Sequence, residues 1–383
     1  MELEQLLPAI SGMTWQHLIM IGVGVTLIYL AIANKYEPTL LLPMGFGAIL
    51  VNIPLSSAIT QIDPATGEAL EGVLNIFFDA GIATEIFPLL IFIAIGAMID
   101  FSSLFRNPSL LLFGAAAQFG IFMTMVLAAL LGYDIREAAS IGIIGAADGP
   151  TSIVVASRFA PHMLGPISVA AYSYMALVPI IQPPVIKLLT SRKERLIRMK
   201  TDANRQISKK ALIAFPIVIT ITAGLIAPSS LALVGFLMFG NLIRECGVLN
   251  KLSLSAQNEL SSLVTILLGI TIASTMTADR FIRVDTLIII GLGLFAFVFD
   301  TFGGVIFAKF LNIFRKEDNK INPMIGACGI SAFPMSARVI HQMGQKEDPY
   351  NYLLMPAISA NVGGQIGSVV AGGIILTLVP LLG

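Results

Sequence analysis

The stretch GAADGPTSIVV, residues 145–155, places a single carboxylate, Asp148, in surroundings that are otherwise almost entirely apolar. Gly149 and Pro150 follow it directly, and both residue types interrupt a helix. An ionised Asp near the centre of a lipid bilayer costs at least ~2.5–3.5 kcal/mol. The stretch therefore predicts a helix break that carries a charge in an apolar environment, where something must compensate that charge.

The composition places the chain in a membrane. Of its 383 residues, 56% are hydrophobic and 12% are charged, and the mean hydropathy is +0.87. Soluble domains carry about a quarter charged residues. Apolar runs long enough to span a bilayer, such as residues 17–34 and 110–132, recur along the chain. We predict an all-α polytopic membrane protein. The net charge of +0 gives no sign of a nucleic-acid partner, and we expect none.

One long basic segment divides twelve hydrophobic elements into two sets of six. This segment, SRKERLIRMKTDANRQISKK at residues 191–210, carries eight Lys or Arg residues against two acidic ones. The positive-inside rule places such a loop in the cytoplasm. We expect an N-terminal transmembrane repeat over residues 1–190, a cytoplasmic basic linker over 191–210 and a C-terminal transmembrane repeat over 211–383.

The two halves show a weak internal likeness. GAADGPTSIVVASR at 145–158 parallels GACGISAFPMSAR at 326–338, since each opens with Gly-Ala, is broken by Gly or Pro and ends in Arg. If both elements are broken or re-entrant helices, each half has about five crossings besides its broken element. The basic linker then falls inside, and the repeats have inverted topology, as in many secondary transporters. Arg280 and Arg283 fall on the wrong side in this scheme.

The polar residues of the later apolar runs are candidate partners for Asp148. A broken helix exposes backbone carbonyls, which are tolerated at membrane depth only where they line a cavity or are buried in protein. A carboxylate with such carbonyls and nearby hydroxyl or amide oxygens predicts a site for a hard cation. The candidates are Asn322, Ser331, Asn361 and Ser368, the last two being seven residues apart on one helical face. Alternatively, Asp148 caps a half-helix in solvent, and the other side chains tie helices together.

Other polar residues allow two interpretations each. Arg338 either holds an anionic substrate or extends its charge to the membrane interface, and Tyr174 either moves a proton or packs in a helix. Asp100 and Asp300 are predicted to face water. Cys246 and Cys328 are predicted to be core residues and not to form a disulfide.

The motifs resemble the β subunits of the sodium-pumping, biotin-dependent decarboxylases that act on oxaloacetate, methylmalonyl-CoA and glutaconyl-CoA. The resemblance covers nearly the whole chain. It is carried by KYEPTLLLPMGFGAILVNIP (35–54), GAMIDF (96–101), GAADGPTSI (145–153), AAYSYMALVPIIQPP (170–184), NPMIGACGIS with SAR (322–338) and NVGGQIGSVVAGG (361–373).

This resemblance implies a subunit that decarboxylates carboxybiotin, consumes a proton and exports Na+. It implies sodium-binding roles for Asp148, Asn361 and Ser368. Tyr174, Asn322, Gly326, Ser331 and Arg338 match the family's other polar positions, near a second cation or the path of carboxybiotin and the proton.

The implied partners are a carboxyltransferase α subunit, a biotin carrier subunit, a small membrane subunit of the γ or δ type, and further copies of this chain. All would lie at a bacterial or archaeal cell membrane. The resemblance also implies that another subunit carries the carboxybiotin. RMKT at 198–201 lacks the Ala-Met-Lys-Met context expected of a biotinylated lysine. A sodium-coupled secondary transporter of a carboxylate, or a membrane scaffold without transport, would fit the residue patterns alone.

Overall fold

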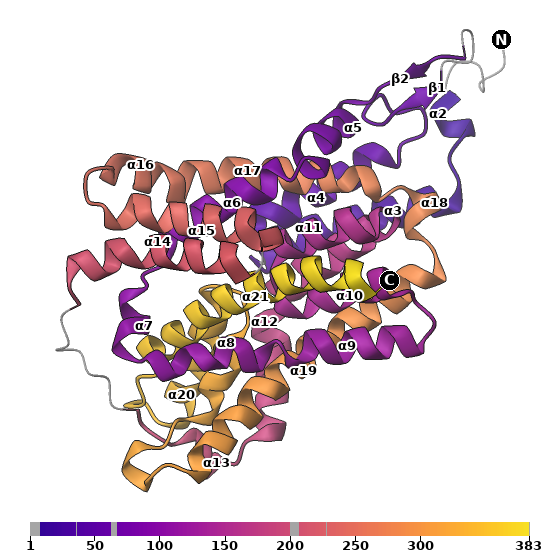
Figure 1. Ribbon diagram of the computed structural model, residues 1–383. Helices are drawn as coiled ribbons and strands as arrows, with labels where there is room; N and C mark the ends of the chain where they lie inside the picture. Colours follow the sequence, from indigo (N-terminus) through magenta and orange to yellow (C-terminus); the bar gives the residue numbers. More distant parts are fainter. Residues whose placement is uncertain (1–7, 36, 63–66, 200–206, 227, 383) are drawn as a thin grey trace.

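The computed structural model describes all residues except 1–7, 36, 63–66, 200–206, 227 and 383. The described residues form helices and one short antiparallel ribbon, in which β1 pairs with β2 (Figure 1). The elements up to residue 189 are α2 (Pro8–Ser11), α3 (Trp15–Ala33), α4 (Pro38–Val51), β1 (Gln61–Ile62), β2 (Ala69–Leu70), α5 (Val73–Phe77), η1 (Phe78–Ala83), α6 (Ile86–Met98), α7 (Ser102–Arg106), η2 (Pro108–Leu110), α8 (Leu111–Ala117), α9 (Phe119–Leu130), α10 (Ile135–Gly142), η3 (Ile143–Ala146), α11 (Gly149–Phe159), η4 (Pro161–Met163) and α12 (Leu164–Leu189).

The basic linker contains the short helix α13, and the described residues after it again form mainly helices. The elements are α13 (Arg192–Arg195), α14 (Lys209–Ile226), η5 (Pro228–Ser230), α15 (Leu231–Glu245), α16 (Asn250–Ser255), η6 (Ala256–Leu260), α17 (Ser261–Ile272), η7 (Ala273–Thr275), α18 (Ala278–Phe281), α19 (Val284–Ile313), η8 (Glu317–Asn319), η9 (Pro323–Gly329), α20 (Met335–Glu347) and α21 (Leu354–Leu382).

Several described helices are long and apolar enough to cross a membrane. They are Trp15–Ala33, Pro108–Leu130, Asn250–Thr275, Val284–Ile313 and Leu354–Leu382, and two bent pairs, Val73–Ala83 with Ile86–Met98 and Pro161–Met175 with Leu177–Leu189, raise the number from 5 to as many as 7. The predicted class, a helical membrane protein, is therefore confirmed. The other hydrophobic runs form shorter or interrupted helices. The inverted relation of the halves, their five crossings each and the boundaries at 190 and 211 stay predictions.

Both predicted helix breaks are present. The first lies between η3 and α11, where Ala147 has a φ of 50° and Asp148 is extended at the N-cap of α11. Pro150 occupies the first turn of α11, where its missing N–H costs no hydrogen bond. The second lies between η9 and α20, with Ile330 extended directly after η9. Interrupted backbone therefore occurs in both elements that the sequence pairs with each other.

Glycine contacts bring α19 against the second break. A Cβ on Gly304 of α19 would lie 2.0 Å from the carbonyl oxygen of Gly326 in η9, and one on Gly326 would lie equally close to the Gly304 oxygen. No side chain fits at either position, so the two backbones touch directly. This close packing of small residues is typical of helix contacts within membranes. It fixes η9 in the interior of the protein.

Asp300 is buried, which corrects the prediction that it faces water. Its side chain is 0% exposed, because the residue lies within the 30-residue helix α19 and not at the end of an apolar run. One carboxylate oxygen accepts a 3.1 Å hydrogen bond from the backbone N–H of Ile121, at the start of α9. The carboxylate thereby caps a helix N-terminus across an interhelical contact.

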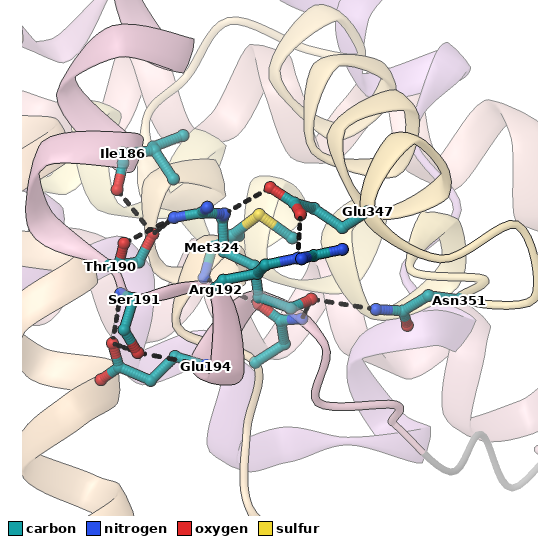
Figure 2. A network of polar contacts seen from close by, with 10 residues as sticks. Ile186, Thr190, Ser191, Arg192, Glu194, Met324, Glu347 and Asn351 are labelled. Atoms are coloured by element: carbon teal, nitrogen blue, oxygen red, sulfur yellow. Dashed lines mark hydrogen bonds and ion pairs between the residues drawn. The ribbon is translucent and has the colours of Figure 1, made fainter.

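Residues 191–199 of the linker are tied to the end of α20. Arg195 forms a 2.7 Å ion pair with Glu347, whose other oxygen lies 3.6 Å from Arg192. Figure 2 shows Arg192 and Glu347 facing each other, with Ser191 and Glu194 forming the capping box of α13. This first part of the linker therefore packs against the C-terminal part of the chain.

Candidate functional site

Asp148 lies at the centre of a buried cluster of hydroxyl groups. Its carboxylate oxygen Oδ2 accepts hydrogen bonds from the hydroxyls of Thr151 at 2.7 Å, Ser368 at 2.8 Å and Ser331 at 3.3 Å. The other oxygen, Oδ1, accepts the Thr151 backbone N–H at 3.4 Å. Asp148 thus caps α11, as the alternative interpretation expects, but it is only 3% exposed and does not face solvent. The cluster unites α11, the second break and α21.

The two helix breaks contribute to this cluster together. Ser331 lies within the second break, and its backbone N–H donates a 2.9 Å hydrogen bond to the carbonyl of Ala146 before the first break. The hydroxyls of Ser331 and Ser368 lie 2.9 Å apart. Residues separated by more than 180 positions therefore form one polar centre, as the sequence predicted for Asp148, Ser331 and Ser368.

Asn361 supports the second break from α21. Its side-chain amide donates to the carbonyl oxygens of Ile330 at 2.7 Å and Cys328 at 3.3 Å. Its own oxygen, Oδ1, is buried and has no hydrogen-bond partner among the described residues. Asn361 thus contacts Ile330, the residue directly before Ser331, and its Oδ1 remains available as an acceptor.

Gln365 is a member of the cluster that sequence reasoning did not single out. Its side-chain amide donates to the carbonyl of Ser331, and its buried Oε1 has no partner in the described part of the chain. It lies four residues after Asn361 and three before Ser368, on the same face of α21. That helical spacing was the signal that could have identified it.

The cluster opens into a cavity of about 280 Å³. Asp148, Tyr172, Ser331 and Gln365 line its buried part, and Glu37, Ser261 and Thr265 are half-buried lining residues. Two carboxylates line the cavity, and no Lys, Arg or His is among its described lining residues. Carboxylates in a low-dielectric enclosure concentrate cations and repel anions.

Tyr172, rather than Tyr174, lines this cavity. Tyr172 is 3% exposed, its ring packs on Gly149, and its hydroxyl has no partner among the described residues. The hydroxyl of Tyr174 instead donates to the carbonyl of Ile290 in α19 at 2.5 Å. Residues two apart in a helix face different directions, so the motif could not tell which tyrosine reaches the site.

The remaining predicted residues lie outside the cluster. Asn322 caps η9 through Met324 N–H and donates two 2.9 Å hydrogen bonds to the linker carbonyls of Arg195 and Ile197. Gly326 packs against α19, as described above. Arg338 is an exposed residue of the first turn of α20. Of the predicted set, the structure groups Asp148, Ser331, Ser368 and Asn361 and places Tyr174, Asn322, Gly326 and Arg338 elsewhere.

Arg338 lies close enough to Glu37 for their charges to interact. Glu37 precedes α4, in the connection after α3. Burial raises the pKa of the Glu37 carboxyl, and the positive charge of Arg338 acts in the opposite direction. The half-buried end of the cavity therefore adjoins an exposed arginine.

The donor set suits a hard alkali-metal cation. Carboxylate, hydroxyl, amide and carbonyl oxygens surround the cluster, whereas the described residues contain no group of three His, Cys, Asp or Glu side chains suited to a metal ion. Oxygen-only donors with a single carboxylate favour weakly charged hard cations over transition metals. The unpartnered oxygens of Gln365 and Asn361 leave acceptor capacity unused.

Comparison with known proteins identifies the family. A family model described as the Na+-transporting oxaloacetate decarboxylase beta subunit matches residues 16–379. The methylmalonyl-CoA decarboxylase subunit beta of Propionigenium modestum is 49% identical over 382 residues, covering 96% of this chain and 96% of that protein.

Relatives named for other substrates are also similar to this chain. The glutaconyl-CoA decarboxylase subunit beta of Acidaminococcus fermentans is 49% identical over 366 residues, covering 96% of this chain and 94% of that protein. The oxaloacetate decarboxylase beta chain of Klebsiella pneumoniae is 43% identical over 434 residues, covering 98% and 99%. The chain therefore belongs to the family of Na+-transporting decarboxylase beta subunits, membrane-bound components of multi-subunit sodium pumps.

Proposed function

We propose that this chain decarboxylates carboxybiotin presented by a partner subunit and couples that reaction to Na+ export through Asp148. The family is one of Na+-transporting decarboxylase subunits, and the observation that carries the residue assignment is the buried Asp148 carboxylate between two helix breaks. A buried carboxylate that lacks a basic partner needs either a proton or a cation. Asp148 can carry one or the other, so a proton arriving at the cluster displaces the sodium ion.

The cluster residues have distinct roles in this proposal. Asp148, Ser368 and Ser331 supply side-chain oxygens to the transported sodium ion, and Asn361 shapes the second break and offers its free Oδ1. Ser331 also passes a proton from the Asp148 side, since its hydroxyl contacts both Asp148 and Ser368. Asn322 and Gly326 hold η9 in place, and they and Tyr174 act by positioning rather than by touching the ion.

Arg338 is the proposed contact for the anionic carboxylate of carboxybiotin. It is exposed and adjoins the cavity without lining it, whereas the cavity itself holds only carboxylates as charged side chains among its described lining residues. When bound nearby, carboxybiotin supplies a carboxylate that leaves as CO2 while its ring nitrogen takes up a proton. Arg338 orients that carboxylate, and the acidic cavity excludes it from the sodium path.

We extend the proposal to the assembly, supported by the family's membership in multi-subunit decarboxylases. A carboxyltransferase α subunit and a biotin carrier subunit would supply carboxybiotin at the cytoplasmic face, a small γ- or δ-type membrane subunit would join the complex, and the chain would occur as a homo-oligomer in the cell membrane. The basic linker and the Arg338 side of the cavity would face the cytoplasm.

The alternative function is sodium-coupled transport of a carboxylate. It shares the cation site but needs a cationic residue within the path, and the described lining residues of the cavity include none. The complete complex therefore should release CO2 from carboxybiotin, and proteoliposomes containing it should accumulate 22Na+ during decarboxylation.

Asp148→Asn tests the assignment. It keeps the size and one acceptor oxygen but removes the charge, so sodium stimulation of decarboxylation should be lost while the complex remains assembled. Asp100→Asn, at a partly exposed position, serves as a matched control that should retain stimulation. Retained sodium stimulation in Asp148→Asn would reject the role of Asp148.

A further inference from the structure

The half-buried end of the cavity has a carboxylate of its own. Glu37 lines the same 280 Å³ cavity as Asp148, but it comes from the connection between α3 and α4 instead of a helix break. Asp148 is buried and Glu37 is half-buried, so Glu37 lies toward the solvent end. Two carboxylates thus line one cavity, with Glu37 nearer the solvent and Asp148 deeper inside.

Hydroxyl groups accompany Glu37 at that end. Ser261 and Thr265, one turn apart at the start of α17, also line the cavity and are half-buried. Deeper in the cavity, the hydroxyl of Tyr172 and the Oε1 of Gln365 are buried without a hydrogen-bond partner among the described residues. Oxygen groups therefore continue from the half-buried carboxylate to Asp148, and the unpartnered ones point to a ligand that accepts their lone pairs.

The backbone at Glu37 is also unusual. Glu37 has a φ of 35° and a ψ of 61°, a left-handed conformation directly before Pro38. Non-glycine residues avoid that region, and strained positions of this kind concentrate at functional sites. This conformation places Glu37 at the N-cap position of α4.

We propose that Glu37, with the hydroxyls of Ser261 and Thr265, forms a cation-collecting station through which sodium reaches Asp148. This inference rests on the proposed sodium role of Asp148 and adds the entry route. A half-buried carboxylate raises the local concentration of Na+ at the cavity mouth and speeds its arrival without taking part in decarboxylation. Arg338, whose charge acts on Glu37, is exposed and lies outside the lining of the cavity, so water screens it more strongly.

Two measurements on the complete purified complex test the station. In the first, Glu37→Gln should raise the apparent KM for Na+ in decarboxylation by about three- to tenfold, the effect of one unit charge at partly screened distance, with kcat unchanged. Glu85→Gln is the matched control. Glu85 is also a half-buried glutamate in left-handed conformation at a helix N-cap, with a φ of 63°, but it does not line the cavity.

The second measurement reads the electrostatics without enzyme activity. In a Cys246→Ser background, Ser261→Cys and, separately, Thr265→Cys place a thiol at the cavity end, and Cys328 is buried. The thiol should react faster with a cationic methanethiosulfonate than with an anionic one of similar size. Glu37→Gln should reduce that rate ratio by about three- to tenfold, and 1 M salt should reduce it similarly, whereas Glu85→Gln should leave it unchanged.

The outcomes separate this proposal from the role of Asp148. An unchanged ratio and an unchanged KM in Glu37→Gln, or thiols that react with neither reagent, overturn the station. Sodium stimulation that persists in Asp148→Asn overturns the proposed function instead, whatever the reagent ratio. Both proposals are supported if Asp148→Asn loses sodium stimulation and Glu37→Gln shows the raised KM for Na+ and the reduced reagent ratio.

Discussion

The backbone N–H of Ser331 donates a 2.9 Å hydrogen bond to the carbonyl oxygen of Ala146, so the two helix breaks are joined directly. Groups freed by a helix break must find partners when they are buried, and here each break supplies a partner to the other. The contact brings the Ser331 hydroxyl to 3.3 Å from the Asp148 carboxylate. Movement of either break therefore changes the geometry around Asp148, which is the property a transport site requires.

Ser368→Ala should weaken sodium binding without unfolding the protein. The hydroxyl contacts the Asp148 carboxylate at 2.8 Å, and a hydrogen bond to a charged group contributes about 1.5–3 kcal/mol. We expect the apparent KM for Na+ in decarboxylation to rise by about tenfold or more. Ser359→Ala on the same helix is the control, because Ser359 bonds the Ser103 carbonyl instead of the cluster. Equal sodium dependence in both variants would remove Ser368 from the site.

Tyr172→Phe and Tyr174→Phe should affect different properties of the protein. The Tyr172 hydroxyl lines the cavity without a partner, so its loss should weaken the Na+ dependence and leave thermal stability unchanged. The Tyr174 hydroxyl binds the Ile290 carbonyl, so its loss should cost about 1 kcal/mol of the free energy of unfolding with a smaller effect on Na+. Thermal denaturation in detergent and sodium titration of activity give both values. A reversed pattern would place Tyr174 in the ion path.

Gly304→Ala should destabilise the contact between α19 and η9. The new Cβ would meet the Gly326 carbonyl oxygen at 2.0 Å, and such overpacking costs about 1–3 kcal/mol. Gly291→Ala, on the same helix, has nothing within 4 Å of the added Cβ and should stabilise the helix by about 0.5–1 kcal/mol. Thermal denaturation of the detergent-solubilised variants should therefore show midpoints that shift in opposite directions. A shift of both midpoints in the same direction would contradict the packing.

Asp300→Ala should destabilise the start of α9. The substitution removes the acceptor for the buried Ile121 N–H, which costs about 1–3 kcal/mol of the free energy of unfolding. Asp300→Asn keeps an acceptor oxygen at the same place and should lose less. Thermal stability measured for both variants decides the matter, since equal losses would show that the charge, and not the hydrogen bond, is what α9 requires.

The sequence by itself determined the class of protein and the centre of the site. Apolar length predicts membrane helices, and Asp148 beside Gly149 and Pro150 predicts an interrupted helix that carries a buried charge, because both follow from local chemistry. The seven-residue spacing of Asn361 and Ser368 likewise placed them on one face of α21, since helical periodicity is local.

Only the tertiary structure decided which polar side chains meet. Tyr172 and Gln365 join Asp148, whereas Tyr174 and Asn322 bond backbone carbonyls elsewhere, because rotation of α12 and docking of the linker depend on contacts distant in sequence. Asp300 is buried for the same reason: neighbouring helices enclose the middle of α19. Periodicity fixes the face on which a residue lies, but only packing between segments determines what that face contacts.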